Sequence, residues 1–237
     1  MSEGLLALAR EALARRDEEP AIAALEAALG ARGDARLWHA LGELHRARDD
    51  SAPALDAMAR AAELAPEDAA IAARRAAFAR DAGIDAVALT RAALALAPAG
   101  DETRLGLAEA LVAQAQVERA EAFVAGLLVD RPGWSAGQAW LARSRWMSGD
   151  PAPLRDLDAA LLRQPSAGEL WRLRIMLAMQ AGDFAAALAV LDRAEAAIGP
   201  APLWLAHRAA CLDELGRTRA AAAAFAALGP PGEVGSA

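Results

Sequence analysis

The sequence predicts an all-α solenoid, because alanine dominates its composition and helix-breaking residues recur along it at a nearly constant spacing. Apolar residues make up 56% of the 237 residues, aromatic residues only 4%, and tyrosine is absent. Alanine has the strongest helix propensity and lets helices approach one another closely. Glycine and proline stand mostly between the alanine-rich runs, which indicates short helices joined by turns.

Prolines end successive apolar runs at spacings of 32, 34, 33 and 35 residues: Pro66, Pro98, Pro132, Pro165 and Pro200. Within several of the intervals between these prolines, a glycine ends an earlier helix: Gly83, Gly149, Gly182 and Gly216. Proline cannot donate the next hydrogen bond of a helix, and glycine readily adopts the left-handed conformation found at helix C-termini. Each interval is therefore predicted to hold two helices, and such pairs must stack on their neighbours to bury their apolar stripes.

Residues 35–68, "ARLWHALGELHRARDDSAPALDAMARAAELAPED", carry a more specific pattern. The Trp, Leu, Gly, Tyr, Ala, Phe, Ala and Pro slots of the tetratricopeptide repeat are held here by Trp38, Leu41, Gly42, His45, Ala54, Met58, Ala61 and Pro66. The chain thus resembles the tetratricopeptide repeat family, whose fold is a right-handed superhelical solenoid.

This resemblance implies about seven repeats within residues 1–228, at 2–34, 35–68, 69–98, 99–132, 133–166, 167–200 and 201–228. Residues 229–237 are expected to form a flexible C-terminal tail. Arg75 and Arg174 stand in the Leu slot of their repeats, and Ile175 stands in the small slot. Those repeats are therefore either splayed or aligned one residue out.

Two of the three histidines lie close together with a glutamate, which raises the question of a metal site. On a helix His39 and Glu43 share a face, but His45 lies about 120° further around the axis, so the three cannot bind one ion. We interpret His45 as a packing residue in the Tyr slot. His207 and Cys211 could form a base and a nucleophile, but Cys211 falls at a small inward position and is interpreted as a buried, unreactive thiol. The sequence predicts no metal, no cofactor and no catalytic residue, and therefore no enzyme.

In tetratricopeptide repeat folds the first helix of each repeat lines a concave groove, so the resemblance implies which residues face a partner protein or peptide. These are Arg36, His39, Glu43, Arg46, Trp140, Arg143, Trp146, Met147, Arg172, Met176, Met179 and His207. Methionine adapts to irregular apolar surfaces, and Trp and Arg are enriched in interface hot spots. We therefore expect an apolar groove in the C-terminal half, with Arg143 and Arg172 as acid-binding points.

A different interpretation assigns Trp140, Trp146 and the methionines to packing between helices, because an alignment error of one residue turns a side chain by about 100°. Trp134, Trp171 and Trp204 are assigned to packing in either case. Some family members bind chaperone C-termini through a clamp built of Lys and Asn. This chain contains neither residue type, so the resemblance does not imply that activity.

Charge and cysteine usage limit the partners and the location. The net charge is −7, which argues against a nucleic-acid partner, because such a partner usually needs a basic face. A single cysteine is compatible with a reducing compartment. The N-terminal segment lacks the apolar core of a signal peptide, and no apolar run reaches the ~20 residues of a membrane span. We expect a cytoplasmic protein that spans no membrane.

The end of the predicted solenoid carries an uncovered apolar helix, "TRAAAAAFAALG", although a terminal repeat normally presents a polar face. We expect it to be covered by a second copy, in a homodimer, or by a domain of a longer protein. The predicted function is a non-catalytic protein–protein interaction scaffold. The alternative is the regulatory or substrate-presenting portion of a larger enzyme system, because alanine-rich bacterial repeat proteins resemble the N-terminal halves of some sulfotransferases and 2-oxoglutarate/iron oxygenases.

Overall fold

The structure, a computed structural model, describes residues 2–29 and 33–227, and these residues form fourteen α-helices and no strand. The predicted all-α class is confirmed. Contacts within the chain divide it into two compact units, unit 1 (Met1–Val124) and unit 2 (Ala125–Ala237). The predicted tail, residues 229–237, lies outside the described residues.

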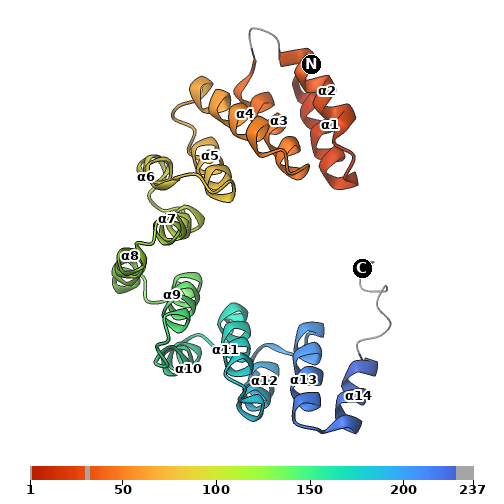
Figure 1. Ribbon diagram of the computed structural model, residues 1–237, viewed down its shortest axis with the longest axis vertical. Helices are drawn as coiled ribbons and strands as arrows, with labels where there is room; N and C mark the ends of the chain where they lie inside the picture. Colours follow the sequence, from red (N-terminus) through yellow and green to blue (C-terminus); the bar gives the residue numbers. More distant parts are fainter. Residues whose placement is uncertain (1, 30–32, 228–237) are drawn as a thin grey trace. The chain divides into compact units, whose positions relative to one another are not determined.

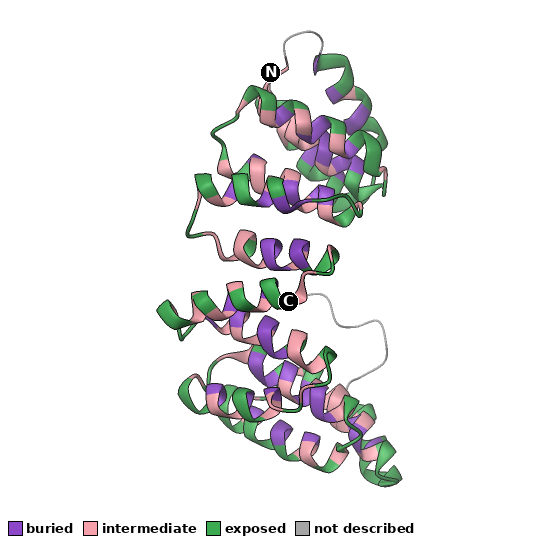
Figure 2. Cartoon of the chain, turned by 60° about the vertical axis from the view of Figure 1, so that its left-hand side comes forward, coloured by how far each residue is buried: buried purple, intermediate pink, exposed green. Residues whose placement is uncertain are grey.

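The helices follow one another in pairs, and each predicted repeat contains one pair (Figure 1). The pairs are α1 (Ser2–Arg15) and α2 (Glu19–Leu29), α3 (Ala35–Ala47) and α4 (Ser51–Leu64), α5 (Ala69–Asp81) and α6 (Val87–Leu96), α7 (Asp101–Ala113) and α8 (Val117–Asp130), α9 (Ser135–Met147) and α10 (Pro153–Arg163), α11 (Gly168–Gln180) and α12 (Phe184–Ile198), and α13 (Pro202–Glu214) and α14 (Thr218–Ala227). Buried residues follow one side of each helix and exposed residues the other, as expected of amphipathic helices (Figure 2).

Side-chain caps and glycines set several helix ends. Asp34 accepts a hydrogen bond from the backbone N–H of Arg36, and Asp68 accepts from Ala70 and Ile71, so both cap the start of a first helix. The glycine series predicted to close the first helices has positive φ throughout, between 69° and 85°: Gly83, Gly149, Gly182 and Gly216. Residues with a side chain rarely adopt this backbone conformation, which explains why glycine recurs at these positions.

Two apolar clusters in the core of unit 1 both include Trp38 at their edge. One joins α1 to α4, and the other joins α4 to α5 through Met58 and Phe78. A Cβ at Gly42 would lie 3.0 Å from Cγ of Met58, so the small slot is filled by the facing helix. His45 is 9% exposed, which confirms the predicted packing role.

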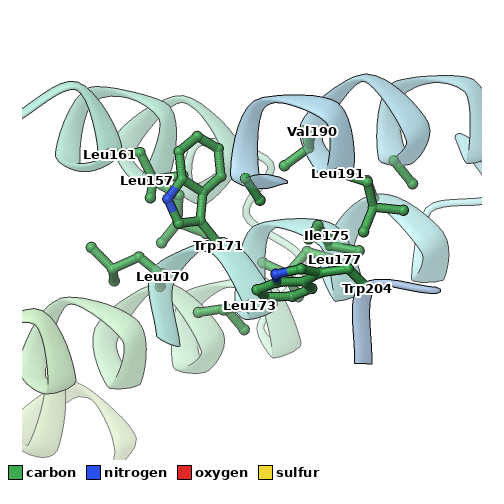
Figure 3. Packing of buried hydrophobic residues seen from close by; sticks show 14 of the residues in the cluster. Leu157, Leu161, Leu170, Trp171, Leu173, Ile175, Leu177, Val190, Leu191 and Trp204 are labelled. Atoms are coloured by element: carbon green, nitrogen blue, oxygen red, sulfur yellow. The ribbon is translucent and has the colours of Figure 1, made fainter. Parts of the chain in front are cut away.

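One large cluster forms the core of unit 2, running through α9 to α13 (Figure 3). In Figure 3 the indole of Trp171 points toward Leu157 and Leu161 of α10. Each such fully buried Leu contributes roughly 1.5–3 kcal/mol relative to an exposed one. Trp134, Trp171 and Trp204 are buried, as predicted.

Two of the three residues that depart from the repeat pattern, Arg174 and Ile175, lie in unit 2 and are accommodated there. Ile175, in the small slot, is completely buried in the core. Arg174, in the Leu slot, extends to α10, where its Nη2 lies 3.1 Å from Oδ2 of Asp158. Cys211 is also completely buried, and burial raises the pKa of its thiol, which agrees with the predicted unreactive role.

Candidate partner-binding surface

The predicted binding residues belong to the first helices of the pairs. We call the side formed by these helices the first-helix face: α3, α5 and α7 in unit 1, and α9, α11 and α13 in unit 2. Residues three or four apart on a helix share a face, so each helix contributes one row of side chains.

On the unit 1 face, Glu43 of α3 and Arg74 of α5 form a bidentate ion pair. Nε and Nη2 of Arg74 donate to the two carboxylate oxygens of Glu43, each at 2.6 Å. Nε2 of His39 lies 3.5 Å from Oε1 of Glu43. Burial raises the pKa of Glu43, but the polar contacts with His39 and Arg74 outweigh it and hold this pKa below its usual value. Glu43 is therefore a charged link between two helices.

Three more arginines of the unit 1 face have acidic partners. Arg36 pairs with Asp34 and Glu3, Arg46 with Asp81, and Arg80 with Glu109. Arg46 also lies over the ring of Phe78, with Cζ 5.3 Å from the ring centroid. Exposed ion pairs add little stability, but they occupy the charges that a partner would otherwise neutralise. The predicted Arg36, His39, Glu43 and Arg46 thus lie on this face with partners already supplied by the chain.

A pocket of about 410 Å³ between α5 and α7 on this face was missed by the sequence analysis. It is lined mainly by small residues, with charged side chains around them: Ala70, Ala73, Arg74, Ala76, Ala77, Arg80, Thr90, Glu102, Thr103, Leu105, Gly106 and Glu109. The sequence does contain a sign of this pocket, because Ala70, Ala73 and Ala77 place small residues along one side of a first helix.

The unit 2 face differs in its charge. Arg143 of α9 and Arg172 of α11 are exposed, and within residues 33–227 no carboxylate pairs with either of them. His207 of α13 is half-buried near Arg172. Burial lowers the pKa of His207, and the positive charge of Arg172 lowers it further. This face therefore presents unneutralised positive charge.

Apolar side chains accompany these two arginines. Trp146 and Met147 follow Arg143 by three and four residues, and Met176 follows Arg172 by four, so they share its side of each helix. Met147 is 80% exposed, whereas Trp146, Met176 and Met179 are half-buried against the core. The half-buried side chains combine a packing role with a surface that a partner can touch.

The prediction for Trp140 is wrong, because this side chain is only 6% exposed and belongs to the interior. Trp140 is the sixth residue of α9, as Leu173 is of α11 and Arg74 is of α5. Leu173 is buried as well, and Arg74 turns to the neighbouring first helix. Trp140 is rotated by about 60° around α9 from Arg143, in the sense opposite to Trp146, and this is enough to move its side chain from the open face into the seam between helices.

Comparison with known proteins supports the repeat assignment. Residues 77–143 match the model of the tetratricopeptide repeat family. No curated protein matches the chain. Among the helices of the described residues, none combines the length and the apolar character needed to cross a bilayer.

Solved structures share the fold at low sequence identity. A tetratricopeptide repeat protein from Parabacteroides merdae ATCC 43184 is 19% identical, with a TM-score of 0.62 over 98% of this chain and 94% of that chain. PilW, a widely conserved type IV pilus biogenesis factor, is 19% identical, with a TM-score of 0.51 over 96% and 91%. The MamA RS-1 ArsTM double mutant is 16% identical, with a TM-score of 0.56 over 76% and 95%.

These matches support the predicted resemblance: residues 77–143 match the tetratricopeptide repeat family, and the chain shares its helical repeat fold with a solved tetratricopeptide repeat protein. The comparisons identify neither its partner nor the residues that bind one.

Proposed function

We propose that the chain is a non-catalytic scaffold that binds an acidic protein or peptide segment on the first-helix face of unit 2. One observation carries this proposal. Arg143 and Arg172 are exposed and have no carboxylate partner within the described residues, whereas Arg36, Arg46, Arg74 and Arg80 of the unit 1 face each have an acidic partner. An incoming carboxylate would gain charge-assisted, bidentate hydrogen bonds without breaking an existing ion pair.

The surrounding side chains fit a peptide that also carries apolar residues. Met147, Met176 and Met179 are flexible and polarisable, so they can adapt to an irregular apolar surface. Partly exposed Trp146 adds a large, rigid contact area, of the kind enriched in interface hot spots. The helices that carry these residues are fixed by the core of unit 2, so little surface ordering is needed on binding. An extended or helical segment is the proposed occupant.

Affinity capture from native lysate, with mass spectrometry of the bound proteins, tests this function. The Arg143→Glu/Trp146→Ala/Arg172→Glu variant should lose the captured partner while keeping its helical circular dichroism. The control is Arg91→Glu/Arg155→Glu, which makes the same charge change at exposed positions on second helices. Equal capture by the wild type and the triple variant would contradict the proposal.

The homodimer predicted from the C-terminal repeat is a separate proposal. Its support is the exposure of α14, in which Ala221 is the one buried residue of Thr218–Ala227 and Phe225 is 50% exposed. Light scattering should give twice the chain mass for the wild type and a smaller mass for Phe225→Glu. A wild type that stays monomeric up to high micromolar concentration would exclude this assembly.

Two further proposals follow from the sequence. One is the alternative that the chain serves as the regulatory or substrate-presenting portion of a larger enzyme system. The other is a cytoplasmic location. Co-purification of a catalytic protein in the capture experiment would favour the first, and cell fractionation tests the second.

A further inference from the structure

A groove in unit 2 lies at the end of α8 and between α9 and α10. It encloses about 250 Å³. Its lining residues are Leu128, Pro132, Gln138, Leu141, Ala142, Arg145, Asp156, Leu157, Ala160 and Arg163. Binding sites for drug-sized molecules are usually roughly 300–1,000 Å³, so this groove is better matched to a single large side chain than to a whole small molecule.

The floor of this groove is apolar and firmly held. Leu141, Leu157 and Ala160 are buried, and Leu157 and Ala160 belong to the core cluster of unit 2. The polar side chain at its edge is also fixed, because Nε2 of Gln138 donates to the carbonyl oxygen of Pro132 at 2.6 Å. A rigid apolar floor can take up a side chain without a cost for ordering the site.

The groove carries an excess of positive charge. Arg145 and Arg163 line it together with one carboxylate, and Nη1 of Arg145 lies 3.9 Å from Oδ2 of Asp156. Arg163 is exposed, and no acidic residue pairs with it in the part of the chain that the structure describes. The corresponding hollow of unit 1, among α2, α3 and α4, is lined instead by Glu26 and Asp56. A carboxylate ligand therefore suits the unit 2 groove and not its counterpart.

Large apolar side chains extend into solvent next to this groove. Val129 and Leu162 are each 81% exposed, and each directly adjoins a lining residue, Leu128 and Arg163 respectively. Single exposed apolar residues are common on protein surfaces, but two beside one apolar hollow indicate a surface for interaction.

We propose that this groove is a second docking site, which takes a partner segment carrying a large apolar side chain next to a carboxylate. The apolar side chain enters the hollow over Leu141, Leu157 and Ala160. The carboxylate binds Arg163, and flanking residues of the partner cover Val129 and Leu162. The site goes beyond the proposed function, because it lies between α9 and α10 beside the end of α8 and uses none of the residues assigned to the first-helix face.

The test uses a blocked five-residue peptide with a central tryptophan and two aspartates on each side. It is titrated calorimetrically into the whole chain carrying Arg143→Glu and Arg172→Glu, so that binding on the first-helix face is removed. A second titration replaces the peptide's tryptophan by alanine. We expect saturable binding of the first peptide and at least fivefold weaker binding of the second.

Two exposed substitutions locate the binding. In the same background, Arg163→Glu and Leu162→Gln should each weaken binding at least fivefold. The matched controls Arg155→Glu, on the same helix, and Leu64→Gln, on α4, should leave the dissociation constant within twofold. All four positions are exposed, so the fold should survive each change, which thermal melting verifies.

Three results would overturn the proposal. The first is the absence of saturable binding. The second is binding by the Arg163→Glu and Leu162→Gln variants as tight as that of the background chain. The third is a concentration-dependent dimer that Leu162→Gln dissociates. The last result would identify a second copy of the chain as the occupant. Because the background variant lacks Arg143 and Arg172, failure here leaves the proposed function of the first-helix face to its own capture experiment.

Discussion

Gln138 and Trp171 occupy the same place in successive repeats and make the same hydrogen bond. Each is the fourth residue of its first helix, and each donates to the carbonyl oxygen of the proline six residues earlier. The donor–acceptor distances are 2.6 Å for Gln138 and 2.8 Å for Trp171. The amide of Gln138 therefore reproduces the N–H of the indole but not its ring, so the ring's contribution to stability can be separated from that of the hydrogen bond.

Trp171→Gln should lower the free energy of unfolding by about 3 kcal/mol, because it removes a buried ring from the core of unit 2. Trp171→Phe keeps a ring but loses the donor, and it should cost about 1–2 kcal/mol. Urea denaturation followed by circular dichroism measures both. If Trp171→Phe were less stable than Trp171→Gln, the hydrogen bond and not the ring would dominate at this position.

The ion pair between Glu43 and Arg74 should make a measurable contribution to the stability of unit 1. Both side chains are half-buried and the contact is bidentate, so we expect a coupling energy of about 1–2 kcal/mol in a double-mutant cycle of Glu43→Gln and Arg74→Met. The cycle requires the free energies of unfolding of the wild type, both single variants and the double variant at pH 7.

The exposed pair of Asp56 and Arg60 provides the control for this cycle. Its side chains are 66% and 54% exposed, so its coupling energy should be below about 0.5 kcal/mol. Coupling at Glu43 and Arg74 no larger than that would show that this bridge does not stabilise the contact between α3 and α5.

Stability should fall in mildly acidic solution partly because of His207. Burial and the charge of Arg172 lower the pKa of His207 in the folded chain, so the unfolded chain binds the proton at higher pH. The free energy of unfolding should therefore decrease as the pH drops below about 6.5, the usual pKa of histidine. Urea midpoints at pH 7.5 and 5.5 should differ less for His207→Gln than for the wild type. Equal differences for the two proteins would contradict this assignment.

The repeat pattern made most of the fold predictable. The spacing of prolines and glycines placed the helix pairs, and the family slots correctly placed His45 in the interior. The direction of individual side chains was harder to predict from the sequence, because a rotation of about 60° separates the open face from the seam where Trp140 is buried. The pairing of charged side chains could not be predicted from the sequence either. Glu43 and Arg74 lie 31 residues apart, and no local pattern shows that Arg74 has a partner while Arg172 has none.

The central claim, that a partner binds the first-helix face of unit 2, is tested most directly by photo-crosslinking. A benzophenone amino acid is placed at Met147 or at Gln180, both exposed on this face, and in a control at Leu64 on α4 of unit 1. The captured partner should crosslink from Met147 and Gln180 and not from Leu64. Crosslinking from Leu64 with none from Met147 or Gln180 would contradict the claim.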